Sequence, residues 1–386
     1  MSKEIKQQYD ICICGGGIAG LLLAYTLGKE GLQVLIVERN AIINPNGADV
    51  LKPSGIEVLE QAGLLNDLLE AEARVRHEVK IFYNGQLLET MDYRKEHIRS
   101  HFMLVPYKVV LNVLLNKLQQ LSNVDILLNT VLTGLQKDAE GTVNAIELNN
   151  KTRVECRVLV GADGVKSTVR EMMNIEASVH TYSQVMYFSQ LPMVASAEEC
   201  NRLYVDSNYG LAYFYPINNK EFRCIFGFNQ EEGTKLLKEE QNLQKLKTRL
   251  KEFVTESDDV LDAVTSLSGF ATFPLCKMHA AEYYRKNVVL LGNAAHAIHP
   301  ITGQGMNLAI EDAGVLSPLL KAYFENSISL PDAFKEFSES RRFINGALLE
   351  YGHRLATSFH SKEQFKDALN LRVQTSNRVK AVLDTI

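Results

Sequence analysis

The stretch from Tyr9 to Glu38, YDICICGGGIAGLLLAYTLGKEGLQVLIVE, constrains the fold of this chain more than any other segment. An apolar run rich in isoleucine leads into a glycine turn, leucines at helical spacing follow, and QVLIVE returns to a strand pattern. This order predicts a βαβ unit, whose two strands lie parallel in one sheet. We therefore expect an α/β fold.

The glycines of this unit, Gly15, Gly17 and Gly20, stand in GxGxxG register. The first two permit a tight turn and the close approach of a pyrophosphate to a helix N-terminus, and the third lets the helix pack on the strand. Glu38 ends the second strand, where its carboxylate would accept hydrogen bonds from a ribose diol, and Arg39 follows as a further candidate. The unit predicts a dinucleotide site but does not separate NAD from FAD.

Composition narrows the class of protein. The 386 residues hold 41 lysines and arginines against 46 aspartates and glutamates, so no basic patch for nucleic acid is expected. The first ten residues lack the apolar core of a signal peptide, and the longest apolar stretch is broken by glycines, so we expect a cytoplasmic protein without a transmembrane segment. Four of the six cysteines are scattered, and Cys12 and Cys14 lie two apart on a predicted strand without two further ligands close by, which favours buried free thiols over a metal site.

Two later motifs separate FAD from NAD. VLVGADGVKSTVR places an apolar strand before Asp163, and GNAAHAIHPITGQGMN, residues 292–307, follows the apolar strand NVVLLG. Together with the N-terminal unit, these loops resemble in order and spacing the three fingerprints of class A flavoprotein monooxygenases, the para-hydroxybenzoate hydroxylase-like family. The resemblance spans residues 10 to about 345.

The resemblance implies a Rossmann-like FAD-binding domain interleaved with a β-sheet substrate domain, followed by C-terminal helices. The FAD-binding domain is expected to comprise residues 1–75, 99–176 and 271–345. The substrate-binding domain would take residues 76–98 and 177–270, and the C-terminal helices residues 346–386.

The resemblance also implies cofactor contacts. Asp163 would lie beside the pyrophosphate and Arg170 would brace that turn. Asn293 stands where the family usually has an aspartate before the ribityl chain, and Lys108, three residues before Leu111, stands where the family has an arginine. Asparagine keeps an acceptor and adds a donor, whereas lysine lacks the planar fork of arginine.

Further along, the turn that begins at Pro300 would run along the flavin ring in such enzymes. The residues expected to line the ring are Pro300, Gly303, Gly305, Met306 and Asn307, and all but the proline offer backbone amides. A helix that begins near Gly305 would aim its N-terminal dipole at the flavin and stabilise the anionic reduced ring.

Three histidines are candidates for catalysis or for structure. His296 and His299 belong to a motif shared with ubiquinone-hydroxylase-like members, where a loop-structuring role and a catalytic-base role both stay open. His77 begins a predicted strand of the substrate domain, where it either faces a ligand or is simply an exposed or satisfied side chain.

Two hairpins are predicted in the substrate domain, with turns at Asn84-Gly85 and Asn218-Asn219. In the second hairpin Tyr213 and Tyr215 point to one face, and Tyr204 lies on the preceding strand. An aromatic face suits a planar aromatic substrate, although aromatic residues in a sheet also serve as plain core. We take the three tyrosines as the candidate substrate residues.

The function implied by the resemblance is FAD-dependent monooxygenation. One oxygen atom from O2 would pass through a flavin C4a-hydroperoxide to a small aromatic substrate, such as an aromatic amine, a phenol or a quinolone-like ring. Several segments look most like the branch that forms alkylquinolone N-oxides. The rival interpretations are a flavin-dependent reductase or dehydrogenase of the same fold, and an FAD-binding regulator without turnover.

The electron source stays open between NADH, NADPH and externally reduced flavin, the last of which would involve a separate flavin reductase. The chain has no second GxGxxG motif, and the segment NGADVLKP lacks the arginine that many relatives place there, with Lys52 as the nearest cation. The sequence makes no prediction about the oligomeric state.

Overall fold

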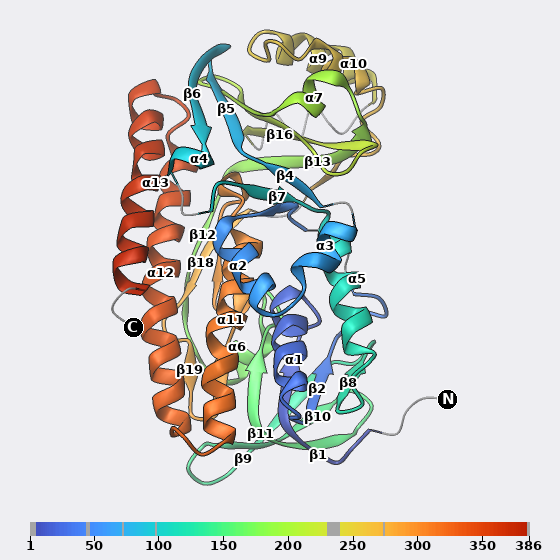
Figure 1. The fold of residues 1–386 in the computed structure, drawn as a ribbon, viewed down its shortest axis with the longest axis vertical. Helices are drawn as coiled ribbons and strands as arrows, with labels where there is room; N and C mark the ends of the chain where they lie inside the picture. Colours follow the sequence, from blue (N-terminus) through green and yellow to red (C-terminus); the bar gives the residue numbers. More distant parts are fainter. Residues whose placement is uncertain are drawn as a thin grey trace.

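The computed structural model describes residues 5–43, 47–71, 73–96, 99–229, 240–272 and 275–383, with side chains described as far as residue 372. Two large sheets lie toward opposite ends of the long axis, and helices α11 (Gly305–Phe324), α12 (Leu330–Thr357) and α13 (Lys362–Leu383) run along one side (Figure 1).

The first large sheet has eight strands around a parallel centre, in the order β19-β20-β11-β1-β2-β8. Its bounds are β1 (Gln8–Cys14), β2 (Val34–Val37), β8 (Val124–Leu127), β11 (Arg153–Gly161), β19 (Tyr284–Arg285) and β20 (Val288–Leu290), with β9 (Leu132–Lys137) and β10 (Val143–Leu148) continuing from β11. Strands β1 and β2 pair in parallel, from Ile11 opposite Val34 to Cys14 opposite Val37. The predicted βαβ unit and the α/β class are confirmed.

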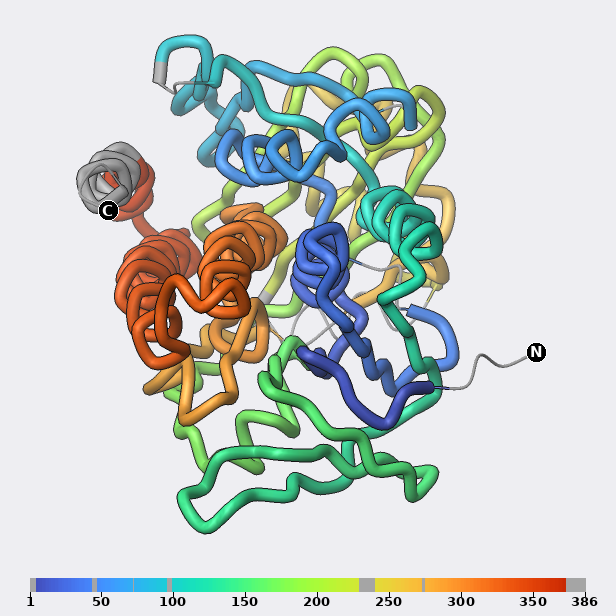
Figure 2. The backbone as a smooth tube through the Cα atoms, turned by 60° about the horizontal axis from the view of Figure 1, so that its bottom comes forward, coloured from blue at the N-terminus to red at the C-terminus, as the bar shows by residue number. Residues whose placement is uncertain are grey.

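Helices cover this sheet because its central strands are apolar on both faces. Helix α1 (Ile18–Lys29) packs between α5 (Tyr107–Leu118) and α11, and Figure 2 shows the three in a row. Leu21, Leu22 and Leu23 of α1 are fully buried in the resulting core. Helix α6 (Thr168–Met172) follows β11, and α12 packs against α11 from outside.

The second large sheet has seven strands in the order β17-β13-β16-β15-β14-β5-β6. Its strands are β5 (Glu78–Tyr83), β6 (Gln86–Asp92), β13 (Gln184–Pro192), β14 (Asn201–Asp206), β15 (Gly210–Pro216), β16 (Glu221–Asn229) and β17 (Ala271–Thr272). Both predicted hairpins are present: Asn84 and Gly85 join β5 to β6 with positive φ angles, and β15 pairs with β16.

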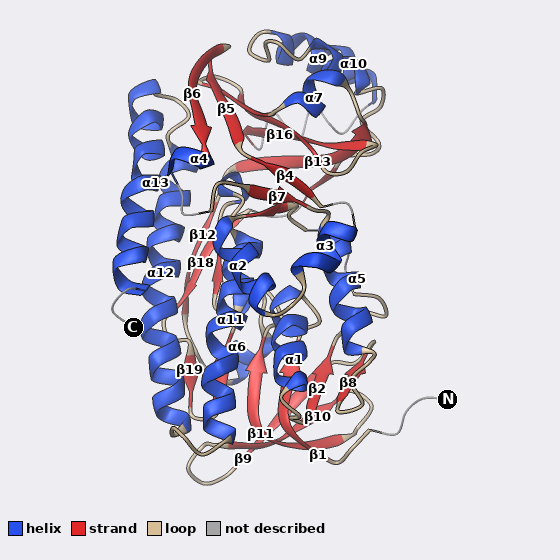
Figure 3. Cartoon of the chain, in the orientation of Figure 1, coloured by secondary structure: helices blue, strands red, loops and turns tan. Residues whose placement is uncertain are grey.

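The second sheet is buried on both faces. Helices α7 (Ala195–Glu199), α9 (Leu243–Lys251) and α10 (Asp258–Ala263), with the short 3-10 helix η1 (Glu240–Asn242), gather at its outer side (Figure 3). Its inner face packs against residues of α12, α13 and the segment around Ile301. The inner face of the second sheet therefore lies on the side of the first large sheet (Figure 1).

Small elements join the regions around the two large sheets. One three-stranded sheet is β12 (Ala177–Thr181), β18 (Cys276–Ala280) and β21 (His296–Ala297), and the other is β3 (Val50–Leu51), β7 (Phe102–Leu104) and β4 (Arg74–Arg76). The remaining helices are α2 (Pro53–Gln61), α3 (Leu65–Glu70), α4 (Tyr93–Glu96), η2 (Gly292–Ala294) and η3 (Pro300–Thr302).

All six cysteines are free thiols. Among the helices of the described ranges, none combines the length and apolar character that crossing a membrane requires. Except for β17, which lies in the second sheet although residues 271–345 were assigned to the FAD-binding domain, the strands of the two large sheets come from the segments assigned above to the two domains, and the domain boundaries stay a prediction.

Candidate functional site

The turn after β1 depends on glycine at two positions. Gly15 has a φ of +115°, and a Cβ there would lie 2.2 Å from the Ala162 carbonyl oxygen. A Cβ at Gly20 would lie 2.2 Å from the Gly15 carbonyl oxygen. At Gly17, which precedes α1, the nearest atom to such a Cβ is the Tyr107 hydroxyl, 3.7 Å away. The protein's own packing requires Gly15 and Gly20, whereas the space beside Gly17 is free for a ligand.

A cavity of about 230 Å³ opens at this turn, and we call it the glycine-turn cavity. Its walls come from the carboxyl ends of β1, β2 and β11, from α5 and from the segment that leads into β9. Its lining residues include Gly15, Gly17, Glu38, Arg39, Tyr107, Asp163 and Gly164. The carboxyl ends of parallel strands are where ligands bind in open α/β sheets.

Glu38 shapes the glycine turn. One carboxylate oxygen accepts a hydrogen bond from the Gly16 amide at 2.8 Å, and the other accepts from the Asn40 amide at 2.9 Å. Arg39 donates through Nη2 to the Asp163 carbonyl at 2.7 Å and so joins the ends of β2 and β11. Glu38 and Arg39 thus hold the two loops that border the cavity.

Asp163 has one engaged carboxylate oxygen and one without a partner. Its Oδ2 accepts from the amides of Thr168 and Val169, at 2.7 and 3.2 Å, at the start of α6. Its Oδ1 is buried and has no hydrogen-bond partner within the described ranges. Burial raises the pKa of this carboxyl. A buried acceptor without a partner at a cavity wall fits a ligand hydroxyl.

The turn after β20 lies next to the same region. Gly292 adopts a φ of +53°, and the side chain of Asn293 is exposed. Arg170 donates to the carbonyls of Ala294 and Val165, each at 2.8 Å. The bracing role expected of Arg170 therefore takes the form of a link between the Asp163 loop and the Asn293 turn.

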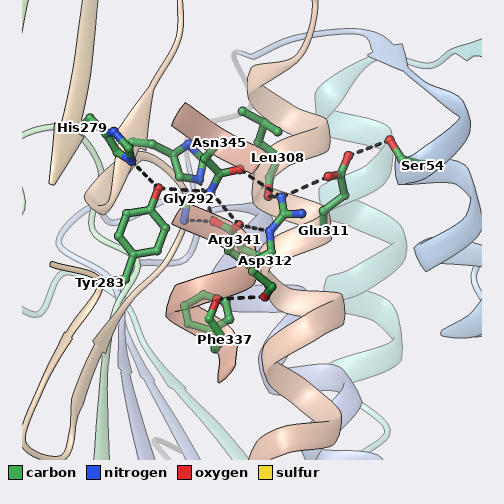
Figure 4. A network of polar contacts seen from close by, with 12 residues as sticks. Ser54, His279, Tyr283, Gly292, Leu308, Glu311, Asp312, Phe337, Arg341 and Asn345 are labelled. Atoms are coloured by element: carbon green, nitrogen blue, oxygen red, sulfur yellow. Dashed lines mark hydrogen bonds and ion pairs between the residues drawn. The ribbon is translucent and has the colours of Figure 1, made fainter. Parts of the chain in front are cut away.

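A buried polar network holds this turn on α11 and α12 (Figure 4). The Asp312 carboxylate accepts from the Gly292 amide at 2.9 Å and pairs with His296 Nε2 at 2.6 Å. Arg341 Nε donates to Asp312 at 2.8 Å, and Asn345 Nδ2 donates to Asp312 and to the Tyr283 hydroxyl, at 3.2 Å each. His296 belongs to this network, which agrees with a loop-structuring role.

His299 is fully buried, and its Nδ1 accepts from the Ile301 amide at 3.3 Å. Its ring lies edge-on to Tyr182 at 4.7 Å. Burial, and then the charge of His353, lower the pKa of His299 to about 3, so its imidazole is neutral at physiological pH and is a weak base. This geometry favours a structural role, and the catalytic-base role stays a prediction.

The segment after His299 forms η3 and then α11. Gly303 has a φ of +61°, and Pro300, Gly303 and Gly305 are half-buried. Met306 is buried, and Asn307 is fully buried. The Asn307 side chain accepts from the Lys52 amide at 2.7 Å and donates to the carbonyls of Val50 and Gly303, at 2.9 Å each. Asn307 therefore ties β3 to this turn through its side chain.

The inner face of the second sheet faces η3 and α12 across a cluster of aromatic side chains, Tyr93, Phe102, Tyr213, Tyr215 and Tyr351, which we call the aromatic layer. The rings of Tyr213 and Tyr215 lie 4.8 Å apart. Tyr213 and Ile301 are partly buried at this layer. Two of the three candidate substrate tyrosines therefore belong to the cluster against which Ile301, in the turn expected to line the flavin ring, also packs.

Tyr204 lies on the opposite face of the sheet, which corrects the expectation that it joins Tyr213 and Tyr215. It pairs with Ala212 in the β14–β15 ladder, so its side chain points to the Phe214 side, where it stacks on Phe82 at 4.6 Å. Its hydroxyl bonds to Ser257 Oγ at 2.9 Å, beneath α10. Tyr204 is a core residue of the outer face.

Two other candidates, His77 and Lys108, lie away from both the glycine-turn cavity and the aromatic layer. His77 is half-buried between β4 and β5, and its Nδ1 contacts the Ser100 carbonyl at 2.7 Å. Lys108 is exposed on α5 and, with Leu111, borders a second hollow of about 770 Å³. The preceding residue, Tyr107, reaches the glycine-turn cavity instead, and its hydroxyl accepts from the Ile18 amide at 3.1 Å.

Sequence reasoning missed Tyr107, Tyr93 and the buried ion pair of Asp49 with Arg223. Arg223 donates to both Asp49 oxygens, at 2.6 and 2.9 Å, and the Tyr215 hydroxyl donates to the same carboxylate at 3.2 Å. The sequence feature that pointed to this ion pair was an arginine within the otherwise largely apolar strand EFRCIFGF. Its partner lies 174 residues away, and a single sequence does not reveal such a contact.

Comparison with known proteins identifies related chains. Residues 8–342 match the FAD binding domain family. PqsL from Pseudomonas aeruginosa, described as a probable FAD-dependent monooxygenase, is 37% identical, with a TM-score of 0.90 over 94% of this chain and 100% of PqsL. Para-nitrophenol 4-monooxygenase of Pseudomonas sp. strain WBC-3 is 27% identical over 90% of this chain and 85% of its own. Ubiquinone hydroxylase UbiM of Neisseria meningitidis is 25% identical over 81% of this chain and 68% of its own.

The residues present fit FAD. The open space beside Gly17 suits a pyrophosphate at the start of α1, and the unpartnered Oδ1 of Asp163 suits a hydroxyl of the ribose or ribityl group. The family match over most of the chain and the identity with PqsL along its full length agree with this fit. The chain belongs to the FAD binding domain family and, within it, to the class A flavoprotein monooxygenases.

Proposed function

We propose that this FAD-dependent monooxygenase inserts one oxygen atom from O2 into a small aromatic substrate that binds at the aromatic layer. The observation that carries the proposal is that Tyr213 of the second sheet and Ile301 of the turn expected to line the flavin ring pack against the same cluster of buried residues. Aromatic side chains stack favourably on a planar ring.

FAD, when bound, supplies the activation of O2. The remaining tasks belong to the chain. We assign the turn at Gly15 and Gly17, together with Glu38 and Asp163, to the adenosine and pyrophosphate end of FAD, and residues 300–307 to the ring end. The Asp312 network supports this assignment, since it fixes the turn at Gly292 between the two ends.

The chain also has to orient the substrate and exclude water. The Tyr215 hydroxyl is held by Asp49, which Arg223 holds in turn, so this part of the aromatic layer is rigid. Tyr351 and Leu355 of α12 belong to the same buried cluster and close the layer from the outside. A rigid, dry site keeps the reactive oxygen from water.

For the substrate class we propose an aromatic amine or a phenol. PqsL, the 37% identical neighbour, has been solved in complex with 2-aminobenzoylacetate, an aromatic amine. The name of para-nitrophenol 4-monooxygenase denotes a phenol. The higher identity with PqsL favours the amine, with oxygen transfer to nitrogen.

For the electron source we propose NADH, NADPH or flavin reduced by a separate reductase. A reductase or dehydrogenase without oxygen insertion is the second candidate function, since the same glycine-turn cavity would serve it.

Turnover under ¹⁸O2 tests the proposed function. The purified holoenzyme would receive reduced flavin, a panel of aromatic amines and phenols, and labelled oxygen, and products would be analysed by mass spectrometry. We expect one labelled oxygen atom in the product. Oxidation of NADH or of a substrate without incorporation of label would favour the reductase or dehydrogenase, and binding without any turnover would favour a regulator.

A further inference from the structure

Lys52 lies where the turn at Gly303 meets the aromatic layer. Its backbone amide donates to Asn307, and its Cε would be 3.9 Å from a Cβ placed on Gly303. Its Nζ donates to the Tyr93 hydroxyl at 3.0 Å. The side chain is only half-buried, although it lies among interior residues. The ammonium group is therefore anchored beside the expected flavin position.

This ammonium group has no carboxylate partner within the described ranges of the chain. Its hydrogen-bond partner is the Tyr93 hydroxyl, and the charged neighbour that acts on it is the guanidinium of Arg372, which already donates to Glu89 at 3.1 Å. Burial, and then Arg372, lower the pKa of Lys52 to about 8, so Lys52 is still mainly protonated at pH 7. Positive charges inside proteins are normally paired, because an unpaired charge loses its hydration without compensation.

The surroundings of Lys52 favour an anion over any other partner. Asp49, the acidic group of the aromatic layer, is neutralised by Arg223. Burial raises the pKa of Tyr213 and of Tyr351, so both phenols keep their protons and are able to donate hydrogen bonds. Tyr351 lies close enough to Arg372 to be affected by its charge. Cations and donors thus gather on one side of an aromatic wall.

We propose that the substrate carries a carboxylate on its aromatic ring or on a short arm, and that Lys52 determines specificity by pairing with that carboxylate. A neutral ring of the same size would leave the ammonium group unpaired. This inference rests on the proposed function, because it assigns the substrate to the aromatic layer. It adds a charge requirement that the aromatic residues alone do not impose.

The test compares an anionic probe with a neutral probe of the same ring. The probes are 2-aminobenzoylacetate and 2-aminoacetophenone, which lacks the carboxylate, and their dissociation constants come from titration of the flavin absorbance of the holoenzyme. The variants are Lys52→Gln, which removes the charge, and Lys52→Arg, which keeps it. Lys335→Gln, on the exposed face of α12, is the matched control. Both Lys52 variants keep the backbone amide that binds Asn307, and thermal melting checks that they fold.

We expect the wild-type protein to bind the anionic probe about tenfold or more tightly than the neutral one. Lys52→Gln should remove most of this preference, Lys52→Arg should restore part of it, and Lys335→Gln should keep it. Equal binding of the two probes by the wild type, weaker binding of both probes to the same extent in Lys52→Gln, or binding of neither probe would overturn the inference.

Failure of this inference is separable from failure of the proposed function. The same preparations would be assayed for incorporation of ¹⁸O into neutral aromatic amines and phenols. Incorporation together with indifference to substrate charge would leave the monooxygenase assignment in place and reject the role of Lys52. Absence of incorporation into any aromatic compound would reject the proposed function itself.

Discussion

The carboxylate of Asp312 accepts a hydrogen bond from the backbone amide of Gly292 at 2.9 Å. Asp312 belongs to α11, whereas Gly292 begins the turn that carries Asn293. The same carboxylate pairs with His296 and with Arg341, so one fully buried side chain fixes both ends of the turn and attaches it to α12.

We predict that Asp312→Ala destabilises the protein by about 3 kcal/mol or more, because Arg341 would remain buried without its main counter-charge. The variant should also release FAD more readily, since Gly292 loses its anchor. Urea unfolding and FAD titration measure the two effects. Glu339→Gln, an exposed acidic residue on α12, is the control. A loss of stability below about 0.5 kcal/mol, the usual range for surface changes, would contradict the anchoring role.

A second prediction concerns Glu38. Glu38→Ala should weaken FAD binding by about 1–3 kcal/mol, because the ribose diol and the Gly16 amide both lose a charged acceptor. Glu38→Gln should have a smaller effect, since the amide keeps one acceptor oxygen. Quenching of flavin fluorescence gives the dissociation constants, with the exposed Glu140→Ala as control. An unchanged dissociation constant in Glu38→Ala would remove Glu38 from the cofactor site.

A third prediction concerns Asn293, which stands where the family usually has aspartate. Its side chain is exposed, so a charge introduced there is largely screened by solvent. Asn293→Asp should therefore leave FAD occupancy, the flavin spectrum and the reduction potential nearly unchanged. Spectroelectrochemical titration measures the potential. A clear fall in potential would show instead that position 293 tunes the flavin, since a nearby carboxylate disfavours the anionic reduced ring.

A fourth prediction concerns stability in acid. Burial lowers the pKa of His299 to about 3 and that of His279 to about 4, below the ordinary value of 6.5. The unfolded chain then binds more protons than the folded one between pH 6.5 and pH 3. The contribution of these residues to stability is complete above pH 6.5 and is lost as the pH falls toward 3. Melting temperatures from pH 7.5 to pH 4 should decline accordingly.

Two substitutions test the origin of this decline. His299→Gln should flatten the dependence of the melting temperature on pH, because the side chain that resists protonation is gone. His360→Gln, at an exposed position, should leave the dependence as in the wild type. Parallel curves for His299→Gln and wild type would refute the assignment to His299.

A fifth prediction is slow direct reduction of the bound flavin by NADH and NADPH. Lys108 is exposed beside the second hollow, and the segment NGADVLKP offers Lys52 in place of the arginine that many relatives have. Anaerobic stopped-flow measurements, with an aromatic substrate bound, would follow flavin bleaching. Turnover supported by externally reduced flavin is the reference rate, and bleaching at that rate by either nicotinamide would contradict the prediction.

The parts of the fold that the sequence predicted are those fixed by local physics. The contact that requires glycine at position 20 appears in the motif itself, since it is made with the Gly15 carbonyl, and the Asn84-Gly85 turn is set by two residues with positive φ. The start of α11 at Gly305 follows from the glycine-rich turn before it. Each of these depends on neighbours within a few residues.

The parts that the sequence did not predict depend on pairing across long separations. The expectation that Tyr204 joins Tyr213 is wrong because the register of β14 against β15 decides which face of the sheet each side chain points to. This register puts Tyr204 opposite Ala212. The contact of Lys52 with Tyr93 and the ion pair of Asp49 with Arg223 arise only when the two sheets approach each other. No local pattern encodes these pairs.

The side chain of Asn307 occupies the edge of β3 much as a neighbouring strand would, since it accepts from the Lys52 amide and donates to the Val50 carbonyl. A Cβ at Gly55 would lie 2.5 Å from the Asn307 side-chain oxygen, so position 55 tolerates no side chain while asparagine stands at 307. In the evolution of this protein, a side chain at position 55 therefore requires a change at position 307 first. A substitution at Gly55 would displace the Asn307 side chain and with it the backbone of Lys52, whose amide Asn307 binds.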